Sequence, residues 1–331
     1  MSFLYLLEKI RNPFLDFIFL TITHLGEELA FLAIGLIVFW CVNKRHGYFM
    51  MLTGFFGIAI NQAMKISFRI KRPWQLDASF TVVDGAVEEA TGYSFPSGHT
   101  QTACGTFGVI AVIAKNKAVR ISAIVIALLV GFSRMYLGVH TPWDVLASIG
   151  IAALVIVLLE PFFSSEEKFR RAMPYIIAAI VAVSAGYMIY SGILYYATPD
   201  EINFVKGYQS GCMLVGCALG FIPVYIIDTK YTNFSTGGKW YSQIIKVAVG
   251  IAITVGLKSL LKLAFLPLMG QFYERALRYF IIVVFAGAVW PLTFKWFEKL
   301  EIPVLDRFAA KAIEFVKSTF AKMKKALKRA K

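Results

Sequence analysis

Residues 96–114 read PSGHTQTACGTFGVIAVIA, a short polar turn that leads directly into an apolar run. The turn predicts the start of a helix, where free backbone N–H groups and the positive end of the helix dipole favour an anion. Ser97 can cap this helix or donate to a ligand, and Gly98 allows a ligand to approach the backbone closely. A histidine such as His99 has no structural role at the start of a helix. The sequence therefore predicts an anion-handling turn at the end of an apolar helix.

Composition places such helices in a bilayer. Of the 331 residues, 58% are hydrophobic, against roughly 45–50% in soluble domains, and the mean hydropathy is +0.66. Crossing ~30 Å of hydrocarbon takes about 20 helical residues. We expect nine apolar runs to span, at residues 27–42, 47–66, 98–114, 119–137, 144–159, 174–195, 205–227, 241–265 and 276–297. The expected fold is an all-α, polytopic membrane helix bundle.

The N-terminal residues fit this pattern poorly, because Glu8, Lys9 and Arg11 separate two short apolar pieces. Neither piece is long enough to span comfortably. We expect residues 1–26 to form an interfacial or re-entrant segment, with a tenth span as the alternative. A cleaved signal peptide is disfavoured, because no small-residue cleavage site follows an uninterrupted apolar core.

Cationic residues mark the ends of two apolar runs. Lys65 closes one run and Arg72-Pro73 follows it, while Ser133-Arg134 lies near the end of another. Taken alone, Lys65 and Arg72 have the simpler interpretation of side chains that snorkel to lipid headgroups. Taken together, three cations at one membrane surface can bind and neutralise a phosphoryl group.

His140 and Asp144 stand four residues apart, where the run at 144–159 begins. On a helix such residues share a face, so Asp144 can accept a hydrogen bond from one ring nitrogen and leave the other free. A carboxylate that fixes the tautomer makes a histidine a better nucleophile. The simpler interpretation is an interfacial histidine and an acid that interacts with the helix dipole. The three polar clusters are separated by two apolar spans and return to one membrane face, which favours a single phosphate-handling site.

With these residues the chain resembles the type 2 phosphatidic acid phosphatase (PAP2) superfamily, whose pattern is K-x6-R-P, then P-S-G-H, then S-R-x5-H-x3-D. Every position matches, through Lys65, Arg72, Pro73, Pro96, Ser97, Gly98, His99, Ser133, Arg134, His140 and Asp144. The resemblance covers residues 27–160 as a PAP2 phosphatase core. It leaves residues 174–297 as additional C-terminal transmembrane helices.

The resemblance implies a metal-independent lipid phosphatase that acts through a phosphohistidine intermediate and needs no cofactor. It implies His140 as the nucleophile, Asp144 as its orienting carboxylate and His99 as the general acid. The phosphate-binding groups that it implies are Lys65, Arg72, Ser97, Gly98 and Arg134. Similar bacterial enzymes act on phosphatidic acid, phosphatidylglycerol phosphate or undecaprenyl diphosphate, so we expect one of these substrates and a bacterial cytoplasmic membrane.

Charge predicts the orientation, because lysine and arginine accumulate in cytoplasmic loops. The basic loops lie at residues 44–45, 115–120, 168–171 and 230–239, with a basic tail at 298–331. The site, together with the acidic loop at 196–203, is then expected to face outward. The tail is expected to be an amphipathic cytoplasmic helix on anionic lipid, or a solvated segment that only fixes topology. Because the tail carries much of the net charge of +14, that charge does not imply a nucleic-acid partner.

Three other functions share parts of this pattern. Vanadate haloperoxidases use the same residue types, but those relatives are soluble. A lipid phosphotransferase would pass the phosphoryl group of His140 to an acceptor other than water. A lipid-binding or transport protein would use the extra spans, in which Lys258 and Lys262 either mark a pathway or snorkel.

Small residues within the extra spans predict close helix contacts. Gly211, Gly216 and Gly220 permit such packing, either within the chain or in a homodimer. The four cysteines all fall in apolar segments and show no ligand-like spacing with histidine. We expect them to be packing residues and predict no metal site.

Overall fold

The computed structural model describes residues 1–307 together with residues 311, 318, 319 and 323. In this part of the chain every regular element is helical, which confirms the expected all-α bundle. The longer helices are α1 (Ser2–Lys9), α2 (Pro13–Thr23), α3 (Glu28–Ile37), α4 (Lys44–Phe68), α7 (Gly98–Ile113), α8 (Lys117–Tyr136), α9 (Pro142–Phe163), α10 (Glu166–Ala197), α11 (Ile202–Ile227) and α12 (Trp240–Val284). Shorter elements are α5 (Pro73–Leu76), α6 (Ala86–Glu89), α13 (Phe294–Glu298), and the 3-10 or π turns η1 (His24–Gly26), η2 (Val38–Val42), η3 (Asp228–Thr232), η4 (Phe285–Val289) and η5 (Trp290–Thr293). The amphipathic helix expected in the tail falls largely outside the described residues.

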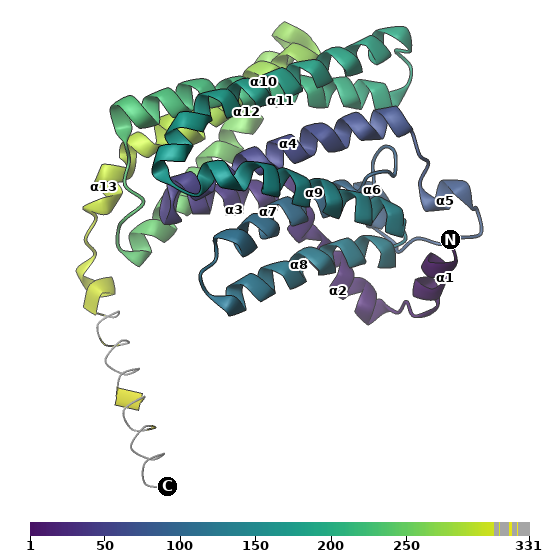
Figure 1. Cartoon of the computed structure of the whole chain (residues 1–331), viewed down its shortest axis with the longest axis horizontal. Helices are drawn as coiled ribbons and strands as arrows, with labels where there is room; N and C mark the ends of the chain where they lie inside the picture. The colour runs from purple at the N-terminus through teal and green to yellow at the C-terminus, as the bar shows by residue number, and fades with distance from the viewer. Residues whose placement is uncertain (308–310, 312–317, 320–322, 324–331) are drawn as a thin grey trace.

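Helix α4 lies at the centre of the bundle (Figure 1). It contacts α7, α9, α10 and α11, and residues 47–55 within it are all buried. A helix that is apolar on every side is stable only inside a core, which explains this position. The helices α10, α11 and α12 pack together on one side of α4, and α7, α8 and α2 pack on the other.

Polar N-caps set where several long helices begin. Side-chain oxygens accept hydrogen bonds from backbone N–H groups in the first turns of α4, α7, α8, α9 and α10. The capping residues are Asn43, Ser97, Asn116, Thr141 and Ser165. Two of these caps, at the starts of α7 and α9, lie in the polar clusters predicted from the sequence.

The number of membrane spans is lower than the nine expected. In the described residues six helical stretches are long and apolar enough to cross a membrane, or seven if the bent pair Pro13–Gly26 and Glu28–Val42 counts as one. Helix α7 has 16 residues, or about 24 Å at 1.5 Å per residue, which is short of a full crossing. The last two expected runs both lie in the stretch Trp240–Glu298. The backbone of Gly270 is non-helical (φ 72°, ψ 173°) and breaks α12 between these two runs, so they form separate helical segments.

The N-terminal segment expected at residues 1–26 contains α1, α2 and η1. Its second part, Pro13–Gly26, meets Glu28–Val42 at an angle of 56°. Such a bend suits either a broken span or a re-entrant loop. The interfacial or re-entrant interpretation therefore stays a prediction.

The two ends of the bundle carry different polar groups. The elements α5 and α6 and the N-terminus lie at one end, and α13 lies at the other (Figure 1). Near the α13 end, Lys44 pairs with Asp228 at 2.9 Å and Lys239 pairs with Asp306 at 2.8 Å. The opposite end holds the polar clusters.

Glycines in α11 set how closely its neighbours approach. A Cβ atom at Gly216 would stand 2.1 Å from the carbonyl oxygen of Ala276 in α12, and one at Gly220 would stand 2.8 Å from Val283. A Cβ atom at Gly211 would stand 2.8 Å from the Cα atom of Met188 in α10. The close packing expected of these glycines therefore occurs within the chain, and it requires no homodimer.

Candidate active site

The predicted polar clusters converge on one cavity of about 240 Å³ at the α5 end of the bundle. Six of the eight predicted site residues line it, namely Lys65, Arg72, Gly98, His99, Arg134 and His140. The other two, Ser97 and Asp144, lie behind this layer and are at most 1% exposed. The clusters are distant in sequence, so the bundle itself brings them together.

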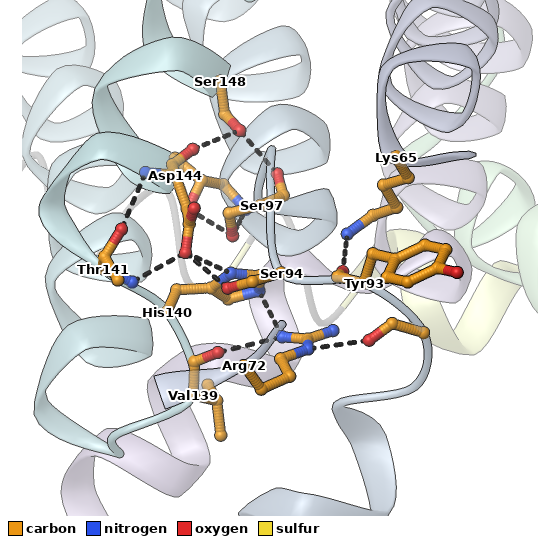
Figure 2. Close-up of polar contacts among 12 residues, drawn as sticks. Lys65, Arg72, Tyr93, Ser94, Ser97, Val139, His140, Thr141, Asp144 and Ser148 are labelled. Carbon is orange, nitrogen blue, oxygen red and sulfur yellow. Dashed lines mark hydrogen bonds and ion pairs between the residues drawn. The ribbon is translucent and has the colours of Figure 1, made fainter. Parts of the chain in front are cut away.

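The imidazole of His140 lies between the carboxylate of Asp144 and the guanidinium of Arg72 (Figure 2). Its Nδ1 atom lies 3.3 Å from Oδ2 of Asp144, and its Nε2 atom lies 2.9 Å from Nη1 of Arg72. Because a guanidinium can only donate, Nε2 must accept, which assigns the ring proton to Nδ1 on the Asp144 side. Burial, followed by the charges of Arg72 and Lys65, lowers the pKa of His140 well below its ordinary value. The ring is therefore neutral, with the lone pair of Nε2 directed toward the cations.

The carboxylate of Asp144 is fixed by several donors. Its Oδ2 atom accepts hydrogen bonds from Oγ of Ser94 at 2.6 Å and from the backbone N–H of Thr141 at 2.7 Å. The Thr141 hydroxyl in turn accepts from the backbone N–H of Asp144, which completes a capping box at the start of α9. Asp144 is thus both a helix-terminal acid and the partner of His140, so the two sequence interpretations of this residue are compatible.

Ser97 acts as the N-cap of α7. Its Oγ atom accepts from the Thr100 hydroxyl at 2.9 Å, and its carbonyl accepts from Oγ of Ser148 at 2.8 Å. Its backbone N–H donates to the carbonyl of Asp144 at 3.1 Å. These bonds tie the start of α7 to the start of α9. The structure places the Ser97 hydroxyl outside the cavity lining, so its role toward a phosphoryl group stays a proposal.

Gly98 and His99 form the first turn of α7, on the cavity side. No protein atom lies within 4 Å of the point where a Cβ atom of Gly98 would stand. The glycine therefore leaves the backbone at the helix start open to the cavity, where an anion would be favoured. A Cβ atom at Gly26 would stand 2.8 Å from the His99 carbonyl oxygen, so that glycine allows η1 to close the cavity beside His99.

Backbone carbonyls hold the Arg72 and Lys65 cations. Arg72 donates to the carbonyl oxygens of Thr91, Gly92 and Val139 at 2.9 to 3.0 Å. Lys65 donates to the carbonyl of Tyr93 at 2.8 Å (Figure 2). Within the described residues neither cation forms a salt bridge, and both are at most 9% exposed. Buried charge without a counter-ion is costly, so this arrangement favours an incoming anion.

Arg134 is fully buried and connects α8 to the turn that carries His140. Its Nη1 atom donates to the Thr23 hydroxyl at 2.7 Å. Its carbonyl oxygen accepts from the backbone N–H groups of Val139 and His140 at 3.1 and 3.2 Å. The same residue therefore contributes a cation to the cavity and fixes the backbone of His140.

Comparison with known proteins shows the family to which the chain belongs. The family model described as "PAP2 superfamily" matches residues 45–168. Phosphatidylglycerophosphatase B of Bacillus subtilis (strain 168) is 33% identical, over 49% of this chain and 82% of that protein. The chain belongs to the PAP2 superfamily. A second model, "PAP2 superfamily phosphatase, transmembrane extension", matches residues 212–301, so the PAP2 classification also extends to α12.

Other PAP2 phosphatases are similar over comparable lengths. Undecaprenyl-diphosphatase BcrC of Bacillus subtilis (strain 168) is 29% identical, over 52% of this chain and 86% of that protein. A probable sphingosine-1-phosphate phosphatase of Dictyostelium discoideum is 26% identical, over 65% of this chain and 54% of that protein. The chain is therefore an integral-membrane lipid phosphatase of the metal-independent PAP2 type.

Sequence reasoning missed several residues of this PAP2 site. Ser94 and Ser148 carry no motif signal, because their partners Asp144 and Ser97 are reached only through the fold. Asn61 lines the cavity and donates to the Ser97 carbonyl at 3.4 Å. It lies one helical turn before Lys65, so helical spacing in α4 is the signal that could have identified it.

Proposed function

We propose that this PAP2 enzyme hydrolyses a phosphomonoester or diphosphate of a membrane lipid through a phosphohistidine at His140. The observation that carries the proposal is the convergence of three buried cations and the imidazole of His140 on one cavity, with Nε2 of the imidazole on the side of Arg72. A dianionic phosphoryl group can supply a counter-charge for Lys65 and Arg72, and the imidazole supplies a nucleophile.

Binding of the phosphoryl group prepares the nucleophile. The phosphoryl oxygens accept hydrogen bonds from Lys65, Arg72, Arg134 and the backbone N–H of Gly98. In the ligand-free structure Arg72 donates to Nε2 of His140. When that N–H turns to a phosphoryl oxygen instead, the Nε2 lone pair becomes free to attack.

The reaction then proceeds in two displacements. The charges of Arg134, Arg72 and Lys65 oppose a proton on His99, and the bound phosphoryl dianion offsets them, so that His99 can be protonated. In the first displacement, Nε2 of His140 bonds to phosphorus, the ester P–O bond breaks, and the protonated His99 gives its proton to the leaving oxygen. The Asp144 carboxylate stabilises the positive charge that forms on the ring. In the second, the now neutral His99 takes a proton from water, the water oxygen bonds to phosphorus, and the N–P bond breaks. Phosphate leaves and His140 returns to its starting form.

The lipid class of the substrate follows from the position of the site. The cavity lies at the end of a bundle of membrane helices, so a lipid can present its headgroup there and keep its chains in hydrocarbon. Phosphatidic acid, phosphatidylglycerol phosphate and undecaprenyl diphosphate are the candidates that we favour, and sphingosine phosphate is a fourth.

Phosphate release in detergent tests this function. We expect the purified protein to release phosphate from at least one of these four lipids with excess chelator present. Turnover that requires added metal, or folded protein that turns over none of them, would contradict the proposal. If radiolabelled phosphoryl groups appear on a lipid or glycerol hydroxyl instead of in free phosphate, the enzyme is a phosphotransferase.

We also propose that the site faces away from the cytoplasm. Support comes from the charge of the loops, because the basic residues of the α3–α4, α7–α8, α9–α10 and α11–α12 connections lie at the opposite end of the bundle. The acidic loop between α10 and α11 approaches the site end, where a Cβ atom at Gly92 would stand 3.5 Å from Asn203.

Cysteine labelling in intact cells tests this orientation. Ala78 lies in the exposed loop after α5, and Lys117 is the exposed first residue of α8. We expect a membrane-impermeant maleimide to label Ala78→Cys and to spare Lys117→Cys until the membrane is opened. The unchanged protein serves as the baseline, since three of its four cysteines are buried. The reverse labelling pattern would place the site on the cytoplasmic face.

A further inference from the structure

A second cavity, of about 300 Å³, lies between the PAP2 core and the transmembrane extension. That volume is at the lower end of the ~300–1,000 Å³ typical of ligand pockets. We propose that this cavity holds a hydrocarbon chain of the lipid whose phosphate occupies the catalytic cavity. The inference rests on the proposed function and adds to it a binding site for the apolar part of the substrate.

The two cavities adjoin each other. Glu28 and Ile58 line both of them. On α4, Met51, Phe55 and Ile58 border the apolar cavity, and Ile58, Gln62 and Lys65 border the catalytic one. The five positions follow one another along α4 at intervals of four, three, four and three residues. They therefore form one stripe along a single helix face, in the order Met51, Phe55, Ile58, Gln62 and Lys65. From Ile58 to Lys65 the stripe rises about 10 Å.

Both parts of the chain build the apolar cavity. Helices α3 and α4 supply one wall, with Phe31 and Phe55 among its residues. The extension supplies the other through α11, α12 and η4, with Phe221, Thr254 and Val283 among its residues. Without the extension the groove on α3 and α4 would lack this wall. We therefore assign a chain-binding role to the transmembrane extension.

The rim of the cavity is open to the bilayer. Leu29 on α3 is 60% exposed and Val255 on α12 is 45% exposed, although both line the cavity. A chain can thus enter sideways between α3 and α12 without leaving hydrocarbon.

The linings of the two cavities differ in polarity, which suits a headgroup in one and a chain in the other. Lys65, Arg72 and Arg134 line the catalytic cavity, whereas the apolar cavity is lined mostly by hydrocarbon side chains. Glu28 stands where the two cavities meet. Of the two lysines that the sequence suggested for a pathway, Lys258 lines the apolar cavity and Lys262 does not.

Because lipid tails are as apolar as the cavity wall, a chain gains little from the hydrophobic effect on entering it. The expected contribution is steric, since the cavity aligns the chain and limits its length. Filling the cavity should therefore discriminate between long and short chains.

Two filling variants test this, one from each wall. Thr254→Phe on α12 and Ala33→Phe on α3 each place an aromatic ring in the cavity. The matched control is Ala252→Phe, because Ala252 lies on α12, is exposed and does not line the cavity. The assay is kcat/KM for dioleoyl and dihexanoyl phosphatidic acid in the same detergent. We expect the filling variants to lose about tenfold on the long chain, equivalent to about 1.4 kcal/mol, and to keep short-chain activity within about twofold, as the control does with both lipids.

Equal effects on both lipids, or no effect on either, would overturn the proposal and leave a cavity occupied by ordinary membrane lipid. A second measurement does not depend on turnover. A non-hydrolysable phosphonate lipid with a photoreactive diazirine near the end of its chain should label peptides of α11 or α12. Label confined to other helices would also overturn the proposal. If the unchanged enzyme hydrolyses neither lipid, phosphatidic acid is not its substrate, and the cross-linking pattern still decides where the chain binds.

Discussion

Replacement of His140 by alanine is expected to lower kcat/KM on a lipid phosphate by about 10⁴-fold or more, which corresponds to at least about 5 kcal/mol of transition-state stabilisation. The variant removes the proposed nucleophile and leaves the cations in place, so it should still bind the headgroup. Phosphate release and lipid binding, measured on the same purified sample, separate these two effects.

His46→Ala provides the control for this experiment. His46 lies at the other end of α4, in its first turn, and does not line the cavity. Its replacement should leave turnover unchanged. A His140→Ala protein that is folded and retains more than a few per cent of normal turnover would exclude His140 as the nucleophile.

Replacement of His99 by asparagine is expected to separate the two chemical steps. An asparagine cannot supply a proton, so turnover of an alkyl phosphate lipid should fall by about 10² to 10⁴-fold. An aryl phosphate such as p-nitrophenyl phosphate has a leaving group that needs no protonation. With that substrate the first displacement should stay fast, and the second should become slow because His99 no longer activates water. The expected observation is a burst of nitrophenolate equal to the enzyme concentration, followed by slow turnover.

Two comparisons make the role of His99 specific. The unchanged enzyme should show no such burst when its second displacement is at least as fast as its first. If the first displacement slows by the same factor on alkyl and aryl phosphates, so that no burst appears, His99 acts in binding or folding and not as the general acid.

The candidate site could be predicted from the sequence because its polar residues lie in short motifs. Lys65, Arg72, Gly98, Arg134 and His140 each stand at the end of an apolar run, and helix ends on one membrane face must come together. The structure places all five on one cavity. Helix starts at Ser97 and Thr141 were also predictable in kind, since polar N-caps act locally.

Features that depend on contacts between residues far apart in the sequence could not be predicted from it. Ser94 reaches Asp144 across 50 positions in the sequence, and nothing in its neighbours indicates that contact. The span count differs in part because the apolar run at 98–114 forms only the 16 residues of α7, which are too few for a full crossing. The apolar cavity arises only where α3 and α4 meet α11 and α12.

Glycine packing shows the same division. The sequence indicated that Gly216 and Gly220 sit at a close helix contact but left the partner open. The contact with Ala276 and Val283 identifies α12 of the same chain as that partner. A pattern on one helix predicts the kind of contact, and only the fold shows which helix is the partner.

The covalent intermediate is the most direct test of the proposed mechanism. Purified His99→Asn protein would be mixed with aryl phosphate, quenched in alkali and digested, and the phosphorylated peptide would be identified by mass spectrometry. We predict a phosphoryl group on His140 that is stable in alkali and lost in acid, at a stoichiometry that matches the burst. A burst without phosphate on His140, or phosphate on another residue, would contradict the phosphohistidine mechanism.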